Sequence, residues 1–479
     1  MLYQNVSKYG LATHLALAAA LPAALAQFVS AGVLSASMLW VSLSAAIWLL
    51  VEPSVLSGET VSAARARVVH RLFRDPLSWF FLVVILFSLV RWLNSGVRLA
   101  FDAETATWSV QEASLSFAPA STGDAGFFPL ALAVSMGIVA LGVKHALGRN
   151  ARIWFGIATG AISAIGGCAA VVCVGLGFEP IASMALSGLG SPYFQGAMFA
   201  LFLPIAVACG IQAEGCGMTK TRLVLAWAVA GNGVGAYFFL PGLLGVSYLV
   251  LSVLIAAFSF VSLHRQVGAA ATARAASMIA FGVFLAVFSS ILPPFSDIQK
   301  AKMDGLDLEK AFPPALADRN EALASITKKI WLEHPWSGAG VGAIPLQAPF
   351  FAGKDDWTVL PPQPTVGPNG FFTLIAERGI SGALLWAIGI GFLLYFWVAR
   401  LVGSFAWQRQ QDEGRSWFLN VPVMVWVGPL VLVACVVDAF FSSGFPLTAL
   451  PACVTAALPL AAASFPKVKR NVATEEKEG

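Results

Sequence analysis

The stretch VGPNGFFTLIAERGISG, Val366–Gly382, joins the longest polar part of the chain to a long apolar run. Residues 367–370 cannot continue a helix, whereas FFTLIAER favours one, and Gly379 is typical of a helix C-terminus. The stretch therefore predicts a turn, a half-helix, a break and then a long apolar helix. Irregular backbone beside a membrane span occurs where protein buries it or where it lines an aqueous cavity, so we expect this junction to form a wall of a site.

The apolar composition of the chain indicates an integral membrane protein. The 479 residues are 58% hydrophobic and 11% charged, with a mean hydropathy of +0.78, well outside the range of soluble globular proteins. A bilayer-spanning helix needs roughly 17 to 25 mainly apolar residues. The sequence therefore predicts an all-α, polytopic membrane protein with about twelve spans. The predicted spans are 10–31, 33–52, 77–97, 126–147, 153–176, 193–213, 222–240, 243–263, 275–294, 380–400, 419–440 and 446–464.

The basic residues predict how these spans are oriented. Lysine and arginine are enriched in cytoplasmic loops, and four arginines lie between residues 65 and 74, after the second span. Alternation from that loop places both termini in the cytoplasm. The predicted regions are 1–294 with spans 1–9, an outer loop at 295–370, 371–464 with the half-helix and spans 10–12, and a cytoplasmic tail at 465–479.

Three further features of the sequence concern processing, metal binding and nucleic-acid binding. Ala24-Leu25-Ala26 resembles a signal-peptidase site, although we favour an uncleaved first span. Six cysteines show no spacing of a metal site or disulfide framework, and the net charge of +4 is accounted for by the inner-side bias. The sequence predicts no metal, no cofactor and no nucleic-acid partner.

The predicted outer loop contains one amphipathic helix. Its apolar residues recur at helical spacing, and Pro335 ends it. Asp318 and Glu321 read as a capping pair, which would put Arg319 at the start of the helix. A glycine-rich turn follows, but it lacks the preceding strand and following helix of a dinucleotide-binding loop. The apolar positions are Leu316, Leu323, Ile326 and Ile330, and the turn glycines are Gly338, Gly340 and Gly342.

Two blocks of this region resemble a known family. DRNEALASITKKIWLEHPWSGAGVGAI, followed by an insert and PNGFFTLIAERGISGALLW, is similar to the carboxyl-terminal part of the O-antigen ligase and O-antigen polymerase superfamily. The resemblance implies a bacterial inner-membrane protein with twelve spans and its main outer, periplasmic loop between spans nine and ten. It also implies metal-independent transfer of a glycan from undecaprenyl diphosphate to a lipid or glycan acceptor, with two arginines on the diphosphate and a loop histidine as the base.

The family's site residues carry over only in part. Arg319 matches one arginine, Asn369 matches an asparagine, and Glu377 with Gly379 matches the end of the second block. Pro368 occupies the place of the histidine. The second arginine is absent from its usual turn, where this chain has Pro241 and Gly242.

His334 is the one histidine predicted to reach the outer side, so it is the candidate substitute base. A positioned general base contributes about 10²- to 10⁴-fold to rate, which proline cannot supply. The alternative is that His334 only ends the loop helix. Arg319 has the alternative of a water-facing residue, and Asn369 that of a turn former.

Two charged residues lie inside apolar runs, Arg91 and Asp438, each near the predicted outer end of its span. A charge at mid-bilayer costs about 2.5 to 3.5 kcal/mol on insertion scales. We therefore expect the two to pair or to line the same outer site. Snorkelling to the interface is the alternative, and it suits the long arginine better than the aspartate.

These observations leave three functional hypotheses. The first is a glycan transferase that takes a lipid-linked glycan donor and binds it through Arg319, Asn369, Glu377, Arg91 and Asp438. The second is a non-catalytic binder of the same glycan lipid, or an assembly partner. The third, a secondary transporter, is less favoured because the sequence shows no internal repeat and no charges near mid-membrane.

Overall fold

The structure is a computed structural model, and it describes most of the first 411 residues. The described residues are 2–25, 31–51, 60–102, 107–111, 120–175, 192–239, 253, 254, 257, 261, 269–291, 314–353, 356 and 369–411. The predicted spans at 419–440 and 446–464, most of the span at 243–263, and the residues Pro241, Gly242, Pro368 and Asp438 lie outside them.

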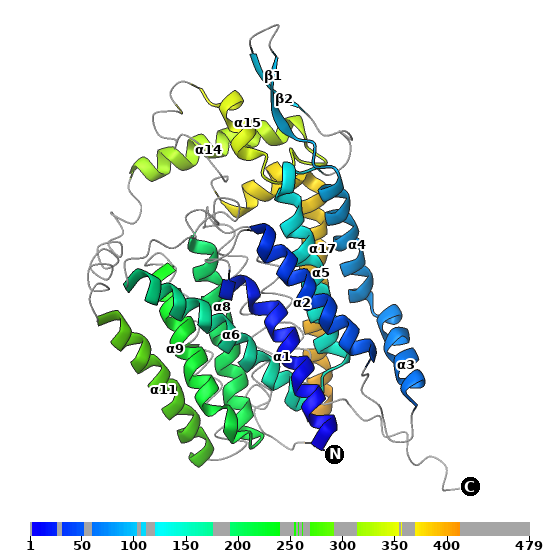
Figure 1. The fold of residues 1–479 in the computed structure, drawn as a ribbon, viewed down its shortest axis with the longest axis vertical. Helices are drawn as coiled ribbons and strands as arrows, with labels where there is room; N and C mark the ends of the chain where they lie inside the picture. Colours follow the sequence, from blue (N-terminus) through cyan, green and yellow to red (C-terminus); the bar gives the residue numbers. More distant parts are fainter. Residues whose placement is uncertain are drawn as a thin grey trace.

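The described part of the chain is a bundle of long helices with a small cap at one end (Figure 1). The bundle helices are α1 Leu2–Leu25, α2 Ala31–Val51, α3 Val61–Arg74, α4 Pro76–Leu93, α5 Phe127–His145, α6 Arg149–Gly175, α8 Pro192–Gly215, α9 Arg222–Phe239, α11 Ala269–Ile291 and α17 Gly370–Gln411. The cap contains β1 Arg98–Asp102, β2 Thr107–Gln111, α14 Pro314–Glu333 and α15 Ile344–Phe351, and the short 3-10 turns are η1 Gly123–Gly126 and η3 Thr219–Thr221. We call the end that carries the cap the loop end.

Five of the described helices are long and apolar enough to cross a membrane. These stretches are Gly32–Leu50, Pro76–Leu93, Phe127–His145, Asn150–Ala169 and Gly370–Phe392, and shorter apolar stretches are Tyr9–Pro22, Leu201–Glu214 and Thr272–Leu285. The mainly helical fold is therefore confirmed, and these helices agree with the expected membrane protein. The count of twelve spans stays a prediction.

Close backbone contact between α6 and α9 organises the core of the bundle. A Cβ at Gly167 would overlap the carbonyl of Gly231, and one at Gly231 would lie 2.5 Å from the Cβ of Ala164. The fully buried Asn232 donates from Nδ2 to the carbonyl of Gly160 at 2.7 Å. Small residues and interhelical amide bonds are the usual means by which membrane helices associate. α1 and α8 also pack against α6, and α5 packs against α1, α2 and α4.

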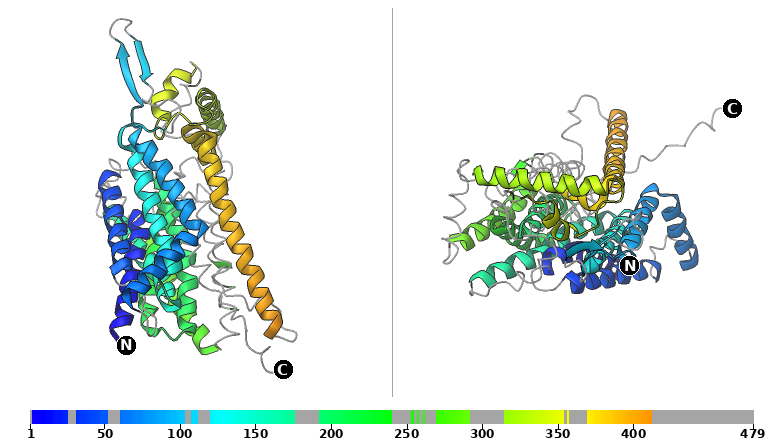
Figure 2. Two further views of the ribbon diagram at one scale, coloured as in Figure 1. Left: turned by 90° about the vertical axis from the view of Figure 1, so that its right-hand side faces the viewer. Right: turned by 90° about the horizontal axis from the view of Figure 1, so that it is seen from above.

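The β1–β2 hairpin departs from the all-α prediction. It projects beyond the bundle at the loop end, as Figure 1 and the left view of Figure 2 show. Its antiparallel register pairs Leu99 with Val110 and Phe101 with Trp108, and such cross-strand apolar pairs stabilise sheets. Leu99 and Phe101, and Trp108 and Val110, recur at every second position, which is a sequence signal for strands that the all-α prediction did not use.

A second departure is α3, which occupies the arginine-rich stretch that was predicted as a cytoplasmic loop. Thr60 begins this helix by accepting a hydrogen bond from the backbone N–H of Ala63 at 3.3 Å. Threonine is a favourable residue at this capping position. The loop therefore contains an ordered helix directly before α4.

The helix predicted within residues 295–370 is present as α14, and Pro335 follows its end as predicted. Its start was predicted wrongly, because the helix begins at Pro314 and not after Asp318. Proline is favoured in the first turn, where its missing N–H costs nothing. Asp318 and Glu321 are therefore not a capping pair, and Arg319 lies in the second turn of α14.

At the end of α4 away from the loop end, Asp75 connects α4 to the end of α5. Its Oδ1 accepts from the N–H of Leu77 at 3.0 Å, which caps α4. Its Oδ2 lies 2.6 Å from Lys144 Nζ and 2.6 Å from His145 Nε2. Burial raises the pKa of this carboxyl, but the hydrogen bonds from His145 and Lys144 outweigh burial and lower it to about 2.

We expect Asp75→Asn to lower the free energy of unfolding by about 1–3 kcal/mol, because Lys144 loses its buried charged partner. Because the pKa of Asp75 is lowered on folding, its contribution is present above the unfolded value of 3.8 and is lost as the pH falls through about 2. The difference from wild type should thus stay constant between about pH 5 and about pH 8. Thermal unfolding in detergent measures it, with the exposed Glu321→Gln as control. Equal unfolding midpoints for Asp75→Asn and wild type would show that the ion pair between Asp75 and Lys144 does not stabilise the fold.

Candidate functional site

The break predicted within Val366–Gly382 is present in α17. Gly379 has φ 63° and ψ −169° inside an otherwise helical segment, so Gly370–Arg378 is a half-helix that precedes the long span. After the break, the N–H of Ile380 donates to the carbonyl of Pro335 at 2.9 Å, and that of Ser381 donates to Trp336 at 3.1 Å. A Cβ at Gly379 would overlap the backbone of Trp336 and Gly338. Only glycine fits here.

The glycine turn, residues 338–342, caps the other side of the same break. The N–H of Ala339 donates to the carbonyl of Ala376 at 2.8 Å, and that of Gly340 donates to Glu377 at 3.1 Å. Gly338 has φ 73°, and a Cβ there would overlap the backbone of Glu377 and Arg378. The last carbonyls of a helix need partners from outside the helix. The glycine turn supplies them for the half-helix.

The glycine turn also binds the segment that follows the hairpin. The N–H of Val341 donates to the carbonyl of Ala120 at 3.1 Å, and the N–H of Thr122 donates back to Val341 at 3.0 Å. Between them, Ser121 donates from Oγ to the carbonyl of Arg91 at 3.1 Å. The end of α4, residues 120–122, the glycine turn and the half-helix are thus one hydrogen-bonded unit.

Glu377 is held in place by this unit. Its Oε1 accepts a hydrogen bond from the backbone N–H of Gly342 at 2.9 Å. Gly342 has φ 77°, and a Cβ there would lie 2.6 Å from Thr122 Oγ1. The carboxylate of the half-helix is therefore positioned by backbone, with no flexible donor involved.

Arg91 is the most unusual residue of the bundle. It is 1% exposed, and its Nε and Nη2 have no hydrogen-bond partner among the described residues. Its guanidinium lies 4.7 Å from the centroid of the Phe87 ring, and the charges of Arg378 and Glu377 act on it electrostatically. A buried charge without hydrogen bonds costs several kcal/mol, on the order of the net stability of a domain. No hydrogen bond within the described residues compensates Nε and Nη2 of Arg91 for this cost.

Arg378 is the second cation of this group, and it is half-buried. A Cβ at Gly382, one turn further on, would overlap the Cβ of Arg378, so Gly382 leaves space for the arginine. We call Arg91, Glu377 and Arg378 the arginine site. It holds two guanidinium groups and one carboxylate, so one positive charge is in excess.

The structure brings together two of the residues predicted from sequence, Arg91 and Glu377. Sequence reasoning missed Arg378, although its place beside Glu377 at the predicted break was a signal. Asn369 caps α17 by accepting from the N–H of Phe372 at 2.9 Å, as the turn-forming interpretation predicts. The side chains of Arg319 and Asp438 lie outside the described residues, so the expected pairing of Asp438 with Arg91 stays a prediction.

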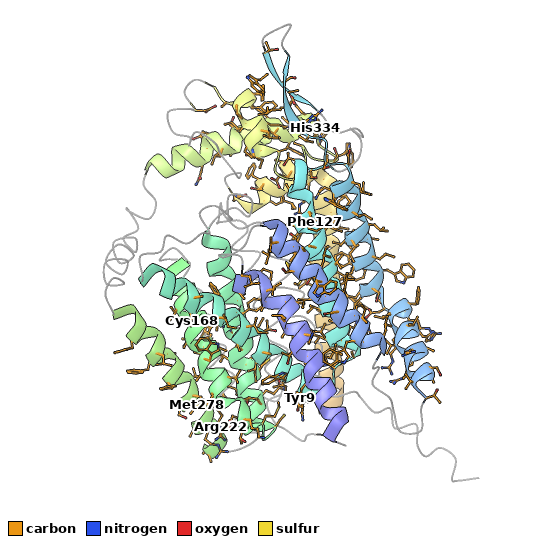
Figure 3. The ribbon with its side chains drawn as sticks, in the orientation of Figure 1. Tyr9, Phe127, Cys168, Arg222, Met278 and His334 are labelled. Carbon is orange, nitrogen blue, oxygen red and sulfur yellow. The ribbon has the colours of Figure 1, made fainter. Side chains whose placement is uncertain are left out.

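His334 follows the last residue of α14, in agreement with a helix-ending role. Its N–H donates to the carbonyl of Trp331 at 3.1 Å, and its own carbonyl accepts from Gly338 at 2.9 Å. The residue lies at the loop end, far from Arg222 at the opposite end (Figure 3). Its ring is half-buried, and no hydrogen bond joins it to a described residue.

Comparisons with known proteins assign no family. Neither a model of a protein family nor a curated protein matches the chain. Within the described residues, no group of three or more histidine, cysteine or acidic side chains is placed to hold a metal ion. The arginine site is therefore interpreted from its own chemistry.

We expect Gly379→Ala to destabilise the protein by at least about 1–3 kcal/mol, because alanine at positive φ is strained and its Cβ overlaps the glycine turn. Gly391→Ala is the matched control on the same helix, since a Cβ there meets nothing within 4 Å. Thermal unfolding of both variants in detergent measures the difference. Equal unfolding temperatures for the two variants would contradict the close contact between the glycine turn and the break at Gly379.

Proposed function

We propose that this chain is a protein of cell-surface polysaccharide assembly that binds an undecaprenyl-diphosphate-linked glycan and transfers it to a lipid or glycan acceptor, as O-antigen ligases and polymerases do. The single observation that carries the proposal is Arg91, buried without hydrogen-bond partners among the described residues and close to Arg378. The charge of the arginine site and its apolar surroundings support the proposal.

The chemistry of the arginine site suits a diphosphate. Nε and Nη2 form one edge of a guanidinium group, and their N–H bonds point in parallel toward a single acceptor group. Such an edge binds phosphate oxygens in a bidentate manner. A diphosphate would satisfy both free donors of Arg91 and would neutralise the excess positive charge. A neutral ligand would leave that charge uncompensated.

The surroundings of the site suit a lipid carrier. Below the site, α4 and α17 meet where Gly389 faces the ring of Phe80. Each helix also exposes large apolar side chains, including Val90 and Leu93 on α4 and Leu384 and Ile388 on α17. A polyprenyl chain could lie along these residues in the bilayer while its diphosphate reaches the arginine site.

The proposal includes the predicted topology. The four arginines between residues 65 and 74 lie at the end of α4 that is opposite the arginine site. With those arginines in the cytoplasm, the loop end faces the periplasm of a bacterial inner membrane. The full protein then has about twelve spans with both termini inside.

A second candidate function is a glycan-lipid binder without transfer activity. Pro368 stands where the resemblance implies the catalytic histidine, and His334 serves as the end of α14. Glu377, the carboxylate of the site, already accepts from Gly342. These observations favour binding over proton transfer, whereas the half-buried ring of His334 at the loop end favours a substitute base.

We expect Arg91→Met to weaken binding of undecaprenyl diphosphate by about tenfold or more, the value of one to two hydrogen bonds to a charged group. The same variant should unfold at an equal or higher temperature, because it removes a buried charge that the ligand-free fold does not compensate. Native mass spectrometry measures lipid binding, and thermal unfolding measures stability.

The control for this variant is Lys328→Met, an exposed cation on α14, which should change neither quantity. A purely structural Arg91 would show the reverse, a lower unfolding temperature with unchanged lipid binding. That result would contradict the proposed role of Arg91 in lipid binding.

We expect His334→Ala to abolish glycan transfer from a lipid-linked donor, with donor binding unchanged, if His334 is the base. Purified protein in nanodiscs with donor and acceptor provides the assay, and Glu333→Gln, an exposed neighbour, is the control. Transfer at the wild-type rate would exclude His334 as the base. No transfer by the wild-type protein, with Arg91-dependent binding retained, would favour the binder.

A further inference from the structure

Three of the four arginines of α3 lie on one face of the helix. Arg67, Arg71 and Arg74 follow one another at spacings of four and three residues, which places them on one side of a helix. His70 lies beside them on that side, and α3 contains no acidic residue. Arg71 and Arg74 are exposed, and Arg67 is half-buried. We call Arg67, His70, Arg71 and Arg74 the basic face.

A different side of α3 is fixed to the bundle. Ala64 and Val68 are buried, and α3 contacts α4 and α5. Arg65, which is not part of the basic face, donates from Nε to the carbonyl of Leu50 in α2 at 2.7 Å. Together with the Thr60 cap, these contacts hold the helix in one orientation.

Between these two sides, α3 leaves an apolar flank exposed. It consists of Val61, Val69 and Phe73, of which Phe73 is 65% exposed. The carbonyl of Phe73 accepts from Nε1 of Trp79 at 2.9 Å, and the two rings are 6.2 Å apart. Trp79, on the first turn of α4, is itself 52% exposed. Tryptophan is enriched where helices cross the boundary between hydrocarbon and water.

The position of α3 matches that boundary. Asp75 separates it from α4, whose whole length is apolar enough to span a membrane. Seen from above, α3 lies at the outer edge of the bundle (Figure 2). The apolar flank and the exposed His70, Arg71 and Arg74 of the basic face thus lie at the level where the span Pro76–Leu93 begins.

We propose that α3 is an interfacial helix that binds the headgroups of anionic phospholipids through its basic face. Val69, Phe73 and Trp79 enter the outer part of the hydrocarbon, and the arginines lie against the phosphates, as in other amphipathic helices at membrane surfaces. Charge complementarity selects anionic lipids. The apolar flank directly beside the arginines selects a lipid surface over a soluble acidic partner, which would leave Phe73 in water.

The test uses the full-length protein in nanodiscs that contain equal amounts of phosphatidylglycerol and phosphatidylcholine. Native mass spectrometry measures which lipids the released protein retains. Each arginine near an anionic surface contributes roughly fivefold to the preference for anionic lipid. We therefore expect wild type to retain phosphatidylglycerol selectively, and Arg71→Gln with Arg74→Gln to reduce that preference by about 25-fold.

Two matched variants control for charge and for folding. Lys220→Gln with Lys328→Gln removes two exposed positive charges elsewhere, and it should leave the preference unchanged. Arg71→Lys with Arg74→Lys keeps the charge, and it should keep the preference. Equal retention of the two lipids by wild type would overturn the proposal, and so would equal preference in wild type and the Arg71/Arg74 glutamine variant.

A photo-crosslinking side chain in place of His70 distinguishes the kind of partner in intact cells. Transfer of the label to phospholipid is the expected result. Capture of a protein in place of lipid would overturn the proposal in favour of a docking surface. Neither experiment involves undecaprenyl diphosphate, so failure here leaves the proposed function standing.

Discussion

The docking of the glycine turn onto the break in α17 is the constraint on which the candidate site depends. Gly338 and Gly379 each have positive φ, and each would overlap the other's segment if it carried a Cβ. The backbone of residues 335–342 provides both the caps of the half-helix and the partners of the chain after the break. Without this contact, Glu377 and Arg378 would have no fixed position relative to α4.

The same contact satisfies the irregular backbone of this junction. Freed carbonyl and N–H groups near a membrane need partners from the protein, and the turn, the break and residues 120–122 satisfy one another. The side chain of Arg91 differs from this backbone. Nε and Nη2 of Arg91 lack such partners among the described residues, and this contrast between a satisfied backbone and an unsatisfied guanidinium supports the proposal that a ligand binds here.

Local signals in the sequence were sufficient for part of this arrangement. Asn369, Gly370 and Gly379 predicted the half-helix and its break because caps and positive φ are properties of a few neighbouring residues. Arg91 was flagged by its cost within an apolar run. The start of α14 was misread because Pro314, a strong first-turn residue, was given less weight than Asp318.

Other parts of the arrangement were not predictable from local pattern. The proximity of Arg378 to Arg91 results from the docking of segments far apart in the chain, and no periodicity encodes it. The hairpin did have a signal, the alternation of Leu99, Phe101, Trp108 and Val110, which a search restricted to helices overlooks. α3 was read from its arginines alone, although its buried Ala64 and Val68 have helical spacing.

The distance along the chain between α4 and α17 has a consequence for biogenesis. Arg91 leaves the ribosome long before the glycine turn and Arg378 are synthesised, so α4 must enter the bilayer while its arginine has none of its final neighbours. An arginine near a helix end then extends toward the headgroups. The approach of Glu377 and Arg378 to Arg91 is therefore a late step, and the arginine site is completed only after α17 has been synthesised and packed against α4.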